Sequence, residues 1–240
     1  MSGAVSHSGW DDFPPPGCLA EEVDQIAIFG ESQVGKTAFL DQFFKARTVN
    51  LYHDNRHTMF VDSKVFDAKY TDISSTALRI ADSTFNPDFF VQTLSEAIGV
   101  VLIYDITSLE SFEHITNGAY MYLWKCKIYM GNDVGGKSCE CILVGNKVDI
   151  LEKEPLRREV DREVAEQWAQ SQGMKHFELT AREHNPVREA VYDLVRATQK
   201  AKERDEAKKQ QSKKTTHDKS DKKPLWKRIS SAIGRPESSA

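Results

Sequence analysis

Eight consecutive residues carry the most specific chemical pattern in the sequence. They match G-x-x-x-x-G-K-[ST], and they are Gly30, Glu31, Ser32, Gln33, Val34, Gly35, Lys36 and Thr37. In such a loop the glycines let backbone N–H groups cradle phosphate oxygens, the lysine reaches the β- and γ-phosphates, and the final hydroxyl ligates Mg²⁺. The pattern therefore predicts a loop that binds the phosphate chain of a nucleotide together with magnesium.

A second pattern, further along the chain, could read a base. Asn146-Lys147-Val148-Asp149 follows the apolar run CILVG. The Asp149 carboxylate can accept two hydrogen bonds from the N1–H and N2–H₂ donors of guanine, a donor pair that adenine lacks. The stem of Lys147 can lie over the same base. The tetrapeptide alone is a weak signal, but together with the phosphate-binding pattern it predicts selection of guanine.

Both patterns need strands and helices to position them, and these elements alternate along the sequence. Short apolar runs typical of buried parallel strands occur at 25–30, 100–106, 141–147 and 176–179. Helical periodicity follows in the stretches 35–47, 108–130, 158–172 and from 186 onward. The segments 59–66 and 76–82 are expected to pair as a hairpin. The alternation predicts an α/β fold with a mostly parallel sheet and helices on both faces.

The composition indicates one folded domain with tails. A chain of 240 residues with 40% hydrophobic and 28% charged residues can bury one core of ordinary size. Its longest apolar stretches are about half the length that crosses a bilayer, and the N-terminus has no signal-sequence pattern. We expect a cytoplasmic protein with a disordered extension at 1–23, a folded domain at 24–200 and a basic disordered tail at 201–240.

The motifs and their order resemble the small GTPases of the Ras superfamily over residues 24–200. The resemblance implies a P-loop NTPase fold, with a mostly parallel six-stranded sheet that contains one antiparallel strand. It implies GTP, GDP and Mg²⁺ as cofactors. It also implies a guanine contact from a stretch that resembles the family's Ser-Ala-Lys, here Thr180, Ala181 and Arg182. The tail has no prenylation cysteine, which resembles the Rad and Gem group rather than most Ras and Rab relatives.

The same resemblance assigns the residues that would sense the γ-phosphate. It places the switch aspartate, which faces the metal ion through water, at Asp82 and the catalytic, water-orienting residue at Asn86. A switch I threonine that closes over Mg²⁺ is expected at Thr58, with Thr48 as its rival. Family members have glycine where this chain has Phe85, which restricts the backbone at that point. We therefore expect intact nucleotide binding and altered hydrolysis.

Two functions from different classes fit these observations. The favoured one is a signalling switch with slow intrinsic GTP hydrolysis. The alternative is a non-cycling, nucleotide-stabilised pseudo-GTPase that acts as an interaction module, so the sequence leaves open whether the chain is an enzyme. A phosphate-loop kinase would need an acceptor site and a lid, for which the sequence has no signal. We expect a monomer that binds protein effectors and regulators and does not bind nucleic acid.

The C-terminal tail is basic, in contrast to the acidic remainder. Residues 199–240 hold thirteen Lys or Arg and six Asp or Glu, although the whole chain has a net charge of −4. An amphipathic helix over 224–234 could hold the protein peripherally on an anionic membrane face without a lipid anchor. Its membrane-facing residues would be Leu225, Trp226, Lys227, Arg228, Ile229 and Ile233. The same composition also fits a solubilising tail, a nuclear-import signal or a calmodulin target.

Overall fold

The structure is a computed structural model that describes residues 23–45, 56–78, 87–131 and 138–220. The chain divides into two units, residues 1–201 and 202–240. The first unit holds the sheet, the phosphate-binding loop and the predicted base-reading residues. In the second unit, the described residues continue the last helix.

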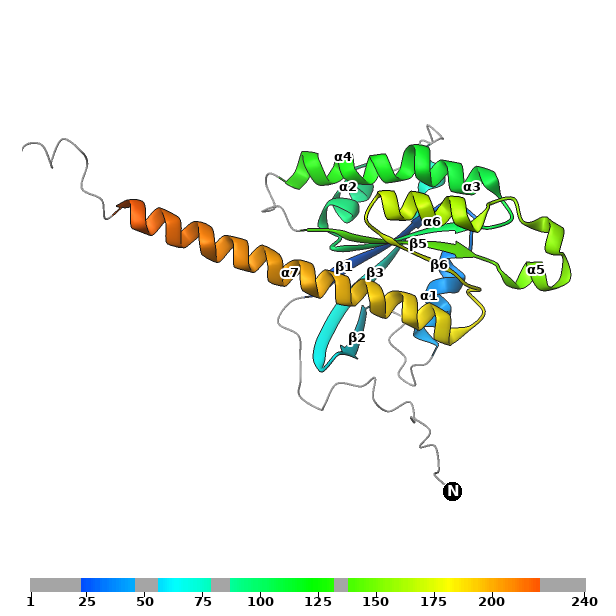
Figure 1. Cartoon of the computed structure of the whole chain (residues 1–240), viewed down its shortest axis with the longest axis horizontal. Helices are drawn as coiled ribbons and strands as arrows, with labels where there is room; N and C mark the ends of the chain where they lie inside the picture. The colour runs from blue at the N-terminus through cyan, green and yellow to red at the C-terminus, as the bar shows by residue number, and fades with distance from the viewer. Residues whose placement is uncertain (1–22, 46–55, 79–86, 132–137, 221–240) are drawn as a thin grey trace, which may run out of the picture. The chain divides into compact units, whose positions relative to one another are not determined.

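A six-stranded sheet forms the centre of the first unit (Figure 1). Its strand order is β2-β3-β1-β4-β5-β6, and β2 is antiparallel to β3 while the other pairs are parallel. This confirms the predicted α/β fold with one antiparallel strand. The strands are β1 Asp24–Gly30, β2 Arg56–Val61, β3 Lys64–Ser74, β4 Gly99–Asp105, β5 Glu140–Asn146 and β6 Lys175–Glu178.

Helices pack on both faces of this sheet. They are α1 Lys36–Phe44, α2 Pro87–Glu96, α3 Leu109–His114, α4 Tyr120–Gly131, α5 Asp149–Lys153, α6 Arg162–Ser171 and α7 His184–Ser220. Short 3₁₀ turns occupy Ser75–Leu78 and Pro155–Arg157, and a π-helical turn at Ile115–Ala119 joins α3 to α4. One core lies between the sheet and helices α1 and α7, and the other lies under α2, α4 and α6.

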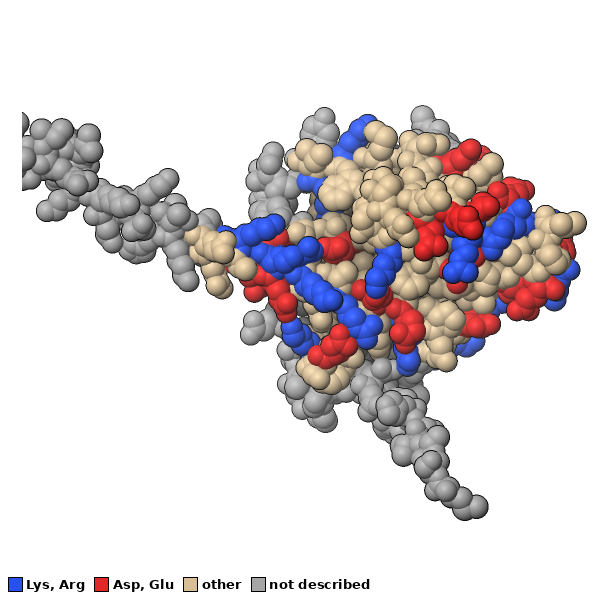
Figure 2. All heavy atoms as spheres, viewed as in Figure 1, with Lys and Arg blue, Asp and Glu red and all other residues tan. Residues whose placement is uncertain are grey.

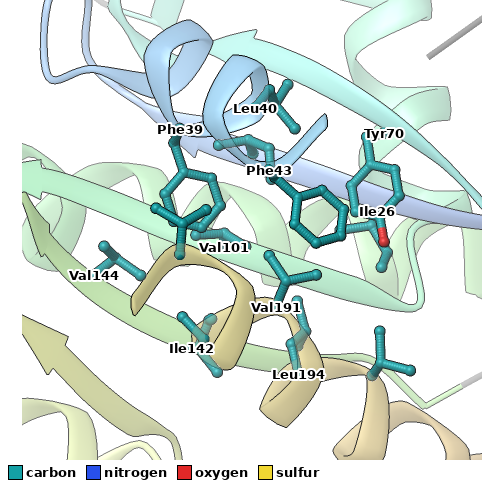
Figure 3. Packing of buried hydrophobic residues seen from close by; sticks show 14 of the residues in the cluster. Ile26, Phe39, Leu40, Phe43, Tyr70, Val101, Ile142, Val144, Val191 and Leu194 are labelled. Carbon is teal, nitrogen blue, oxygen red and sulfur yellow. The ribbon is translucent and has the colours of Figure 1, made fainter. Parts of the chain in front are cut away.

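The two cores follow directly from the apolar runs of the sequence. All seven residues of β4 are buried, as expected for a parallel strand covered on both faces. On the α1–α7 side, Phe39 and Phe43 of α1 pack in one core with Val191 and Leu194 of α7, on the same face of the sheet (Figure 3). Burial of these large side chains contributes about 1.5–3 kcal/mol each. The two cores therefore hold the strands, and with them the strand ends that carry the candidate site, in fixed positions.

The hairpin differs from its prediction. The hairpin consists of β2 and β3, which both end before residue 75. A tight turn at Asp62 and Ser63, with φ of 48° and 65°, joins the two strands. Residues 75–78 form a 3₁₀ turn, so the strand predicted at 76–82 is wrong for the part that the structure describes. The full length of β3 was not predicted because the strand contains a polar residue, Asp67, at a buried position. The ion pair with Arg56 of β2 allows this burial.

Helix boundaries also shift from the predicted positions. Helix α6 begins at Arg162, because the Asp161 side chain caps the Glu163 N–H at 2.7 Å. The tail was predicted to be disordered from residue 201, whereas in the structure α7 continues to Ser220. This stretch has no glycine or proline and is rich in Lys, Glu, Gln, Arg and Ala, which are strong helix formers. Residues 1–22 and 221–240 lie outside the described residues.

Candidate functional site

The phosphate-binding pattern lies between the end of β1 and the start of α1, as its mechanism requires. Glycine is necessary at both glycine positions of the motif. A Cβ atom on Gly30 would lie 2.2 Å from the Ile103 carbonyl oxygen, and one on Gly35 would lie 2.2 Å from the Asn146 amide nitrogen. Gly35 also has a φ of 99°, in the left-handed region. The loop therefore fits closely between β4 and the end of β5.

Lys36 points back across the loop. Its ammonium nitrogen donates to the Glu31 carbonyl oxygen at 2.6 Å and lies 3.8 Å from an Asp72 carboxylate oxygen. Burial lowers the pKa of Lys36, and the charge of Asp72 opposes that shift. The lysine is thus held at the mouth of the loop, from which it can reach a bound phosphate.

Thr37 and Asp72 form a pair of oxygen ligands beside this lysine. The Thr37 hydroxyl donates to the Asp72 carboxylate at 2.6 Å. Magnesium prefers hydroxyl, carboxylate and water oxygens, and it is usually bound through only one or two protein ligands plus phosphates. The pair fits that requirement without any rearrangement of the backbone. Asp72 was not singled out from the sequence, although the Thr-Asp pair at 71–72 lies in the segment that follows the hairpin turn.

Among the residues predicted for metal binding and catalysis after the loop, the structure describes Thr58 and places it far from Thr37. Thr58 pairs with Asp67 on β3, whereas the phosphate loop begins beside Ser74 at the other end of that strand. At about 3.3 Å per residue the separation is about 20 Å, so Thr58 cannot ligate a metal ion held by Thr37. Thr48, Asp82, Phe85 and Asn86 lie outside the described residues.

The 3₁₀ turn after β3 brings two further residues to the loop. The Thr76 hydroxyl accepts a hydrogen bond from the Ser32 N–H at 2.9 Å. Ser75 is fully buried, and its carbonyl oxygen lies 3.1 Å from His114 Nε2 on α3. Neither residue was singled out from the sequence, because a Ser-Ser-Thr run carries no pattern until the end of β3 is known.

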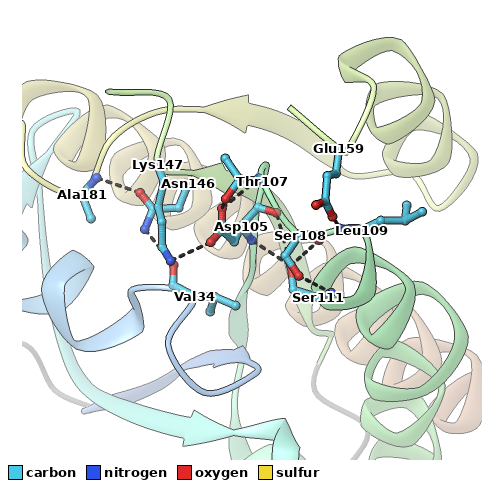
Figure 4. Close-up of polar contacts among 10 residues, drawn as sticks. All are labelled: Val34, Asp105, Thr107, Ser108, Leu109, Ser111, Asn146, Lys147, Glu159 and Ala181. Atoms are coloured by element: carbon cyan, nitrogen blue, oxygen red, sulfur yellow. Dashed lines mark hydrogen bonds and ion pairs between the residues drawn. The ribbon is translucent and has the colours of Figure 1, made fainter. Parts of the chain in front are cut away.

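Asn146 joins the phosphate loop to the loop after β6. Its side-chain amide donates to the Val34 carbonyl oxygen at 2.8 Å, and its side-chain oxygen accepts from the Ala181 N–H at 2.8 Å. Figure 4 shows both contacts at the end of β5. Asn146 is almost completely buried, so each of these bonds is costly to lose. The asparagine therefore fixes the spacing between the two predicted halves of the site.

Lys147 is held by an acid that was not singled out from the sequence. Its backbone adopts φ of 73°, and its ammonium nitrogen lies 2.6 Å from the Asp105 carboxylate at the end of β4. Asp105 also accepts from the Thr107 N–H at 2.9 Å and from its hydroxyl at 2.7 Å (Figure 4). The lysine stem is thereby extended along the strand ends. That orientation is suited to a side chain that lies over a base.

Asp149 lies at the start of α5, next to the loop after β6. One carboxylate oxygen accepts from the Thr180 hydroxyl at 2.7 Å, and the other from an Arg182 guanidinium nitrogen at 2.7 Å. The Arg182 side chain is 81% exposed, so the guanidinium can leave this oxygen at little cost. The structure thus brings together the predicted residues Asn146, Lys147, Asp149, Thr180, Ala181 and Arg182.

Comparison with known proteins places this arrangement in a family. Residues 25–200 match the Ras family. The chain is 31% identical over 181 residues to the GTP-binding protein YPTM1 of Zea mays, covering 74% of this chain and 79% of that protein. It is 28% identical over 175 residues to the Ras-related protein Rab-21 of Bos taurus, covering 72% and 71%.

A third relative is a much longer protein. The chain is 33% identical over 181 residues to the Ras-related protein Rab-44 of Homo sapiens, which covers 72% of this chain and 16% of that protein. The similarity therefore concerns one part of that relative. The resemblance to the Rad and Gem group stays a prediction.

Proposed function

The chain belongs to the Ras family of GTP-binding proteins, and we propose that it acts as a signalling switch with slow intrinsic GTP hydrolysis. The observation that carries the proposal is the Asn146 link, because it holds the phosphate loop and the base-reading residues at a fixed spacing. A nucleotide that meets both halves at once is selected for its base and for its phosphate chain.

The roles of the individual residues follow from their positions. Asp149 would accept from the guanine N1–H and N2–H₂ groups, with Lys147 lying over the ring and the Ala181 N–H near the guanine oxygen. Lys36 and the loop N–H groups would bind the β- and γ-phosphates. Thr37 and Asp72 would hold Mg²⁺, which supplies charge neutralisation at the phosphate oxygens. Asp72 thereby takes the role that the sequence suggested for Asp82.

Slow hydrolysis is supported by the residues that the structure places beside the loop. A hydrolytic site needs a side chain that orients the attacking water, a role that glutamine fills in Ras. Among the described residues, the turn after β3 offers Ser75, which is buried, and Thr76, which is bonded to Ser32. A threonine hydroxyl is shorter than a glutamine amide and carries a single donor.

The alternative, a pseudo-GTPase that acts as an interaction module, is favoured by the surface of α4. Met121, Trp124 and Ile128 follow one another at helical spacing and are 55%, 39% and 67% exposed. In Figure 2 the surface over α4 is mostly free of charged side chains. Contiguous apolar residues on a surface commonly mark a protein-binding site. A switch would also use such a surface, so its presence alone does not separate the two functions.

Nucleotide extraction and single-turnover kinetics test the proposal. Nucleotide released from the purified protein should be GTP or GDP. A single-turnover rate at or below about 10⁻⁴ s⁻¹, the intrinsic rate of Ras, is expected, together with different protease sensitivity in the GTP and GDP states. Bound adenine nucleotide would overturn the proposal. Identical proteolysis in both states, without any hydrolysis, would favour the interaction module.

Membrane attachment through the tail is part of the same proposal. No described helix combines the length and hydropathy needed to cross a bilayer. The basic residues of 222–235 would instead bind an anionic surface, at about 1 kcal/mol each. Co-sedimentation with anionic liposomes should be lost when the chain ends at residue 221, and it should weaken in a Trp226→Ala variant. Equal sedimentation of intact and truncated chains would contradict the attachment.

A further inference from the structure

We infer that Thr76 is a ligand for the terminal phosphate, and that its hydroxyl makes this protein prefer GTP to GDP. The inference rests on the proposed function, since it assigns one more residue to the same nucleotide site. It also moves the phosphate-sensing role from residues 82–86 to the 3₁₀ turn that directly follows β3.

The position of Thr76 is set by its hydrogen bond to the phosphate loop. Loop N–H groups are the donors that receive phosphate oxygens, and one of them, Ser32 N–H, lies 2.9 Å from the Thr76 hydroxyl oxygen. The side chain therefore stands at the surface of the loop where an anion would lie. This hydrogen bond joins Thr76 directly to the phosphate loop.

Lys36 shows which end of the phosphate chain is nearest to Thr76. Its ammonium nitrogen lies 2.6 Å from the carbonyl oxygen of Glu31, the residue immediately before Ser32. A lysine in this motif reaches the β- and γ-phosphates. The Glu31–Ser32 side of the loop is consequently the side of the terminal phosphate, and Thr76 is bonded to that side.

The hydrogen-bonding capacity of a hydroxyl suits this place. A threonine hydroxyl has one donor and two acceptor lone pairs, so it can accept from Ser32 N–H and still donate its own proton. A phosphate oxygen is a strong acceptor for that proton, and hydrogen bonds with one charged partner are stronger than neutral ones. GDP, which lacks the terminal phosphate, would leave this donor without a phosphate partner.

The backbone just before Thr76 is held by two contacts, so the hydroxyl is already in place before a nucleotide binds. Ser74, the last residue of β3, pairs with Gly30, the first residue of the loop. The Ser75 carbonyl oxygen lies 3.1 Å from His114 Nε2, and Ser75 is fully buried. A preorganised ligand loses little conformational freedom on binding.

Nucleotide affinities of a Thr76→Val variant test the inference. Valine keeps the shape of threonine and replaces its hydroxyl with a methyl group. The affinity for a non-hydrolysable GTP analogue should fall by at least about tenfold, as expected for one hydrogen bond to a charged group, and the affinity for GDP should stay within about twofold. Binding is measured by titration with fluorescent nucleotides, after thermal unfolding has shown that the variant is folded.

Two further variants make the result specific. Thr76→Ser restores a hydroxyl and should restore the preference for the GTP analogue. Thr58→Val removes a hydroxyl from β2, about 20 Å away along the sheet, and should change neither affinity. If Thr76→Val weakens both nucleotides equally, weakens neither, or tightens the GTP analogue, the inference is wrong while the proposed function stands. If the native protein binds neither nucleotide, both fail.

Discussion

The base-reading end of the site, Asn146 to Asp149 with Thr180 to Arg182, contrasts with the segment after β3, Ser75 and Thr76. The base-reading end has the complete family motif, and its side chains bond to one another and to the phosphate loop. The segment after β3 has serine and threonine close to the phosphates, held by Ser32 and His114. Both regions follow strands of the same sheet: the base-reading residues lie at or just after the ends of β5 and β6, and Ser75 and Thr76 follow β3.

Nucleotide binding and γ-phosphate sensing can therefore change independently in one site. Selection of a base needs a few fixed donors and acceptors, which the Asn146 link supplies. Sensing of the γ-phosphate needs a segment that moves and a side chain that orients water. In this chain the described start of the corresponding segment, Ser75 and Thr76, is held by His114 and Ser32. The comparison predicts large effects from changes at the base-reading end and smaller effects from changes after β3.

The largest effect is expected for Asp149→Asn. The change removes the carboxylate that would accept two hydrogen bonds from guanine, and hydrogen bonds to charged groups are worth about 1.5–3 kcal/mol each. GTP affinity should fall by at least about 100-fold, while xanthosine triphosphate should bind better than GTP, since the amide can donate to the xanthine oxygen. Competition binding with both nucleotides measures this. The matched control is Arg182→Ala, which removes only the exposed partner of Asp149 and should leave the base preference unchanged.

A smaller effect, in the direction of increased activity, is expected for the double change Ser75→Gly and Thr76→Gln. Glycine frees the backbone of the segment after β3, and glutamine supplies a side chain that can orient water. Single-turnover hydrolysis should rise about tenfold. The corresponding changes Phe85→Gly and Asn86→Gln serve as the control and should not raise it. The opposite pattern would return the sensing role to residues 82–86.

The smallest effects concern stability, and they compare one anchor from each region. Asn146→Ala should lower the free energy of unfolding by about 2 kcal/mol, because the buried Val34 carbonyl and Ala181 N–H both lose a partner. His114→Leu should lower it by about 1 kcal/mol through loss of the Ser75 contact. Urea unfolding of the nucleotide-free proteins measures both. A larger loss for His114→Leu would show that the segment after β3 is the firmer of the two regions.

The sequence predicted those parts of the site that have a local motif directly after a buried strand. The phosphate loop and the base-reading motif each follow a continuous apolar run that is typical of a buried parallel strand. Asp72 was missed because β3 contains Asp67, Lys69 and Thr71, and the ion pair that allows Asp67 to be buried comes from another strand. Asp105 was missed because its partner Lys147 lies far along the chain. Such pairings depend on the register of the sheet, which a single sequence does not determine.

The Asn146 link also bears on how the protein is made. The two hydrogen bonds of its side chain close segments of 112 and 35 residues. Because a chain is synthesised from its N-terminus, the phosphate loop leaves the ribosome long before the residues that complete the site. Contacts between such distant residues form late and slowly. A nascent chain that ends before Asn146 therefore has a phosphate loop without its partner, and one that ends before Ala181 has only half of the link. Capture of a nucleotide should begin only after Ala181 has emerged.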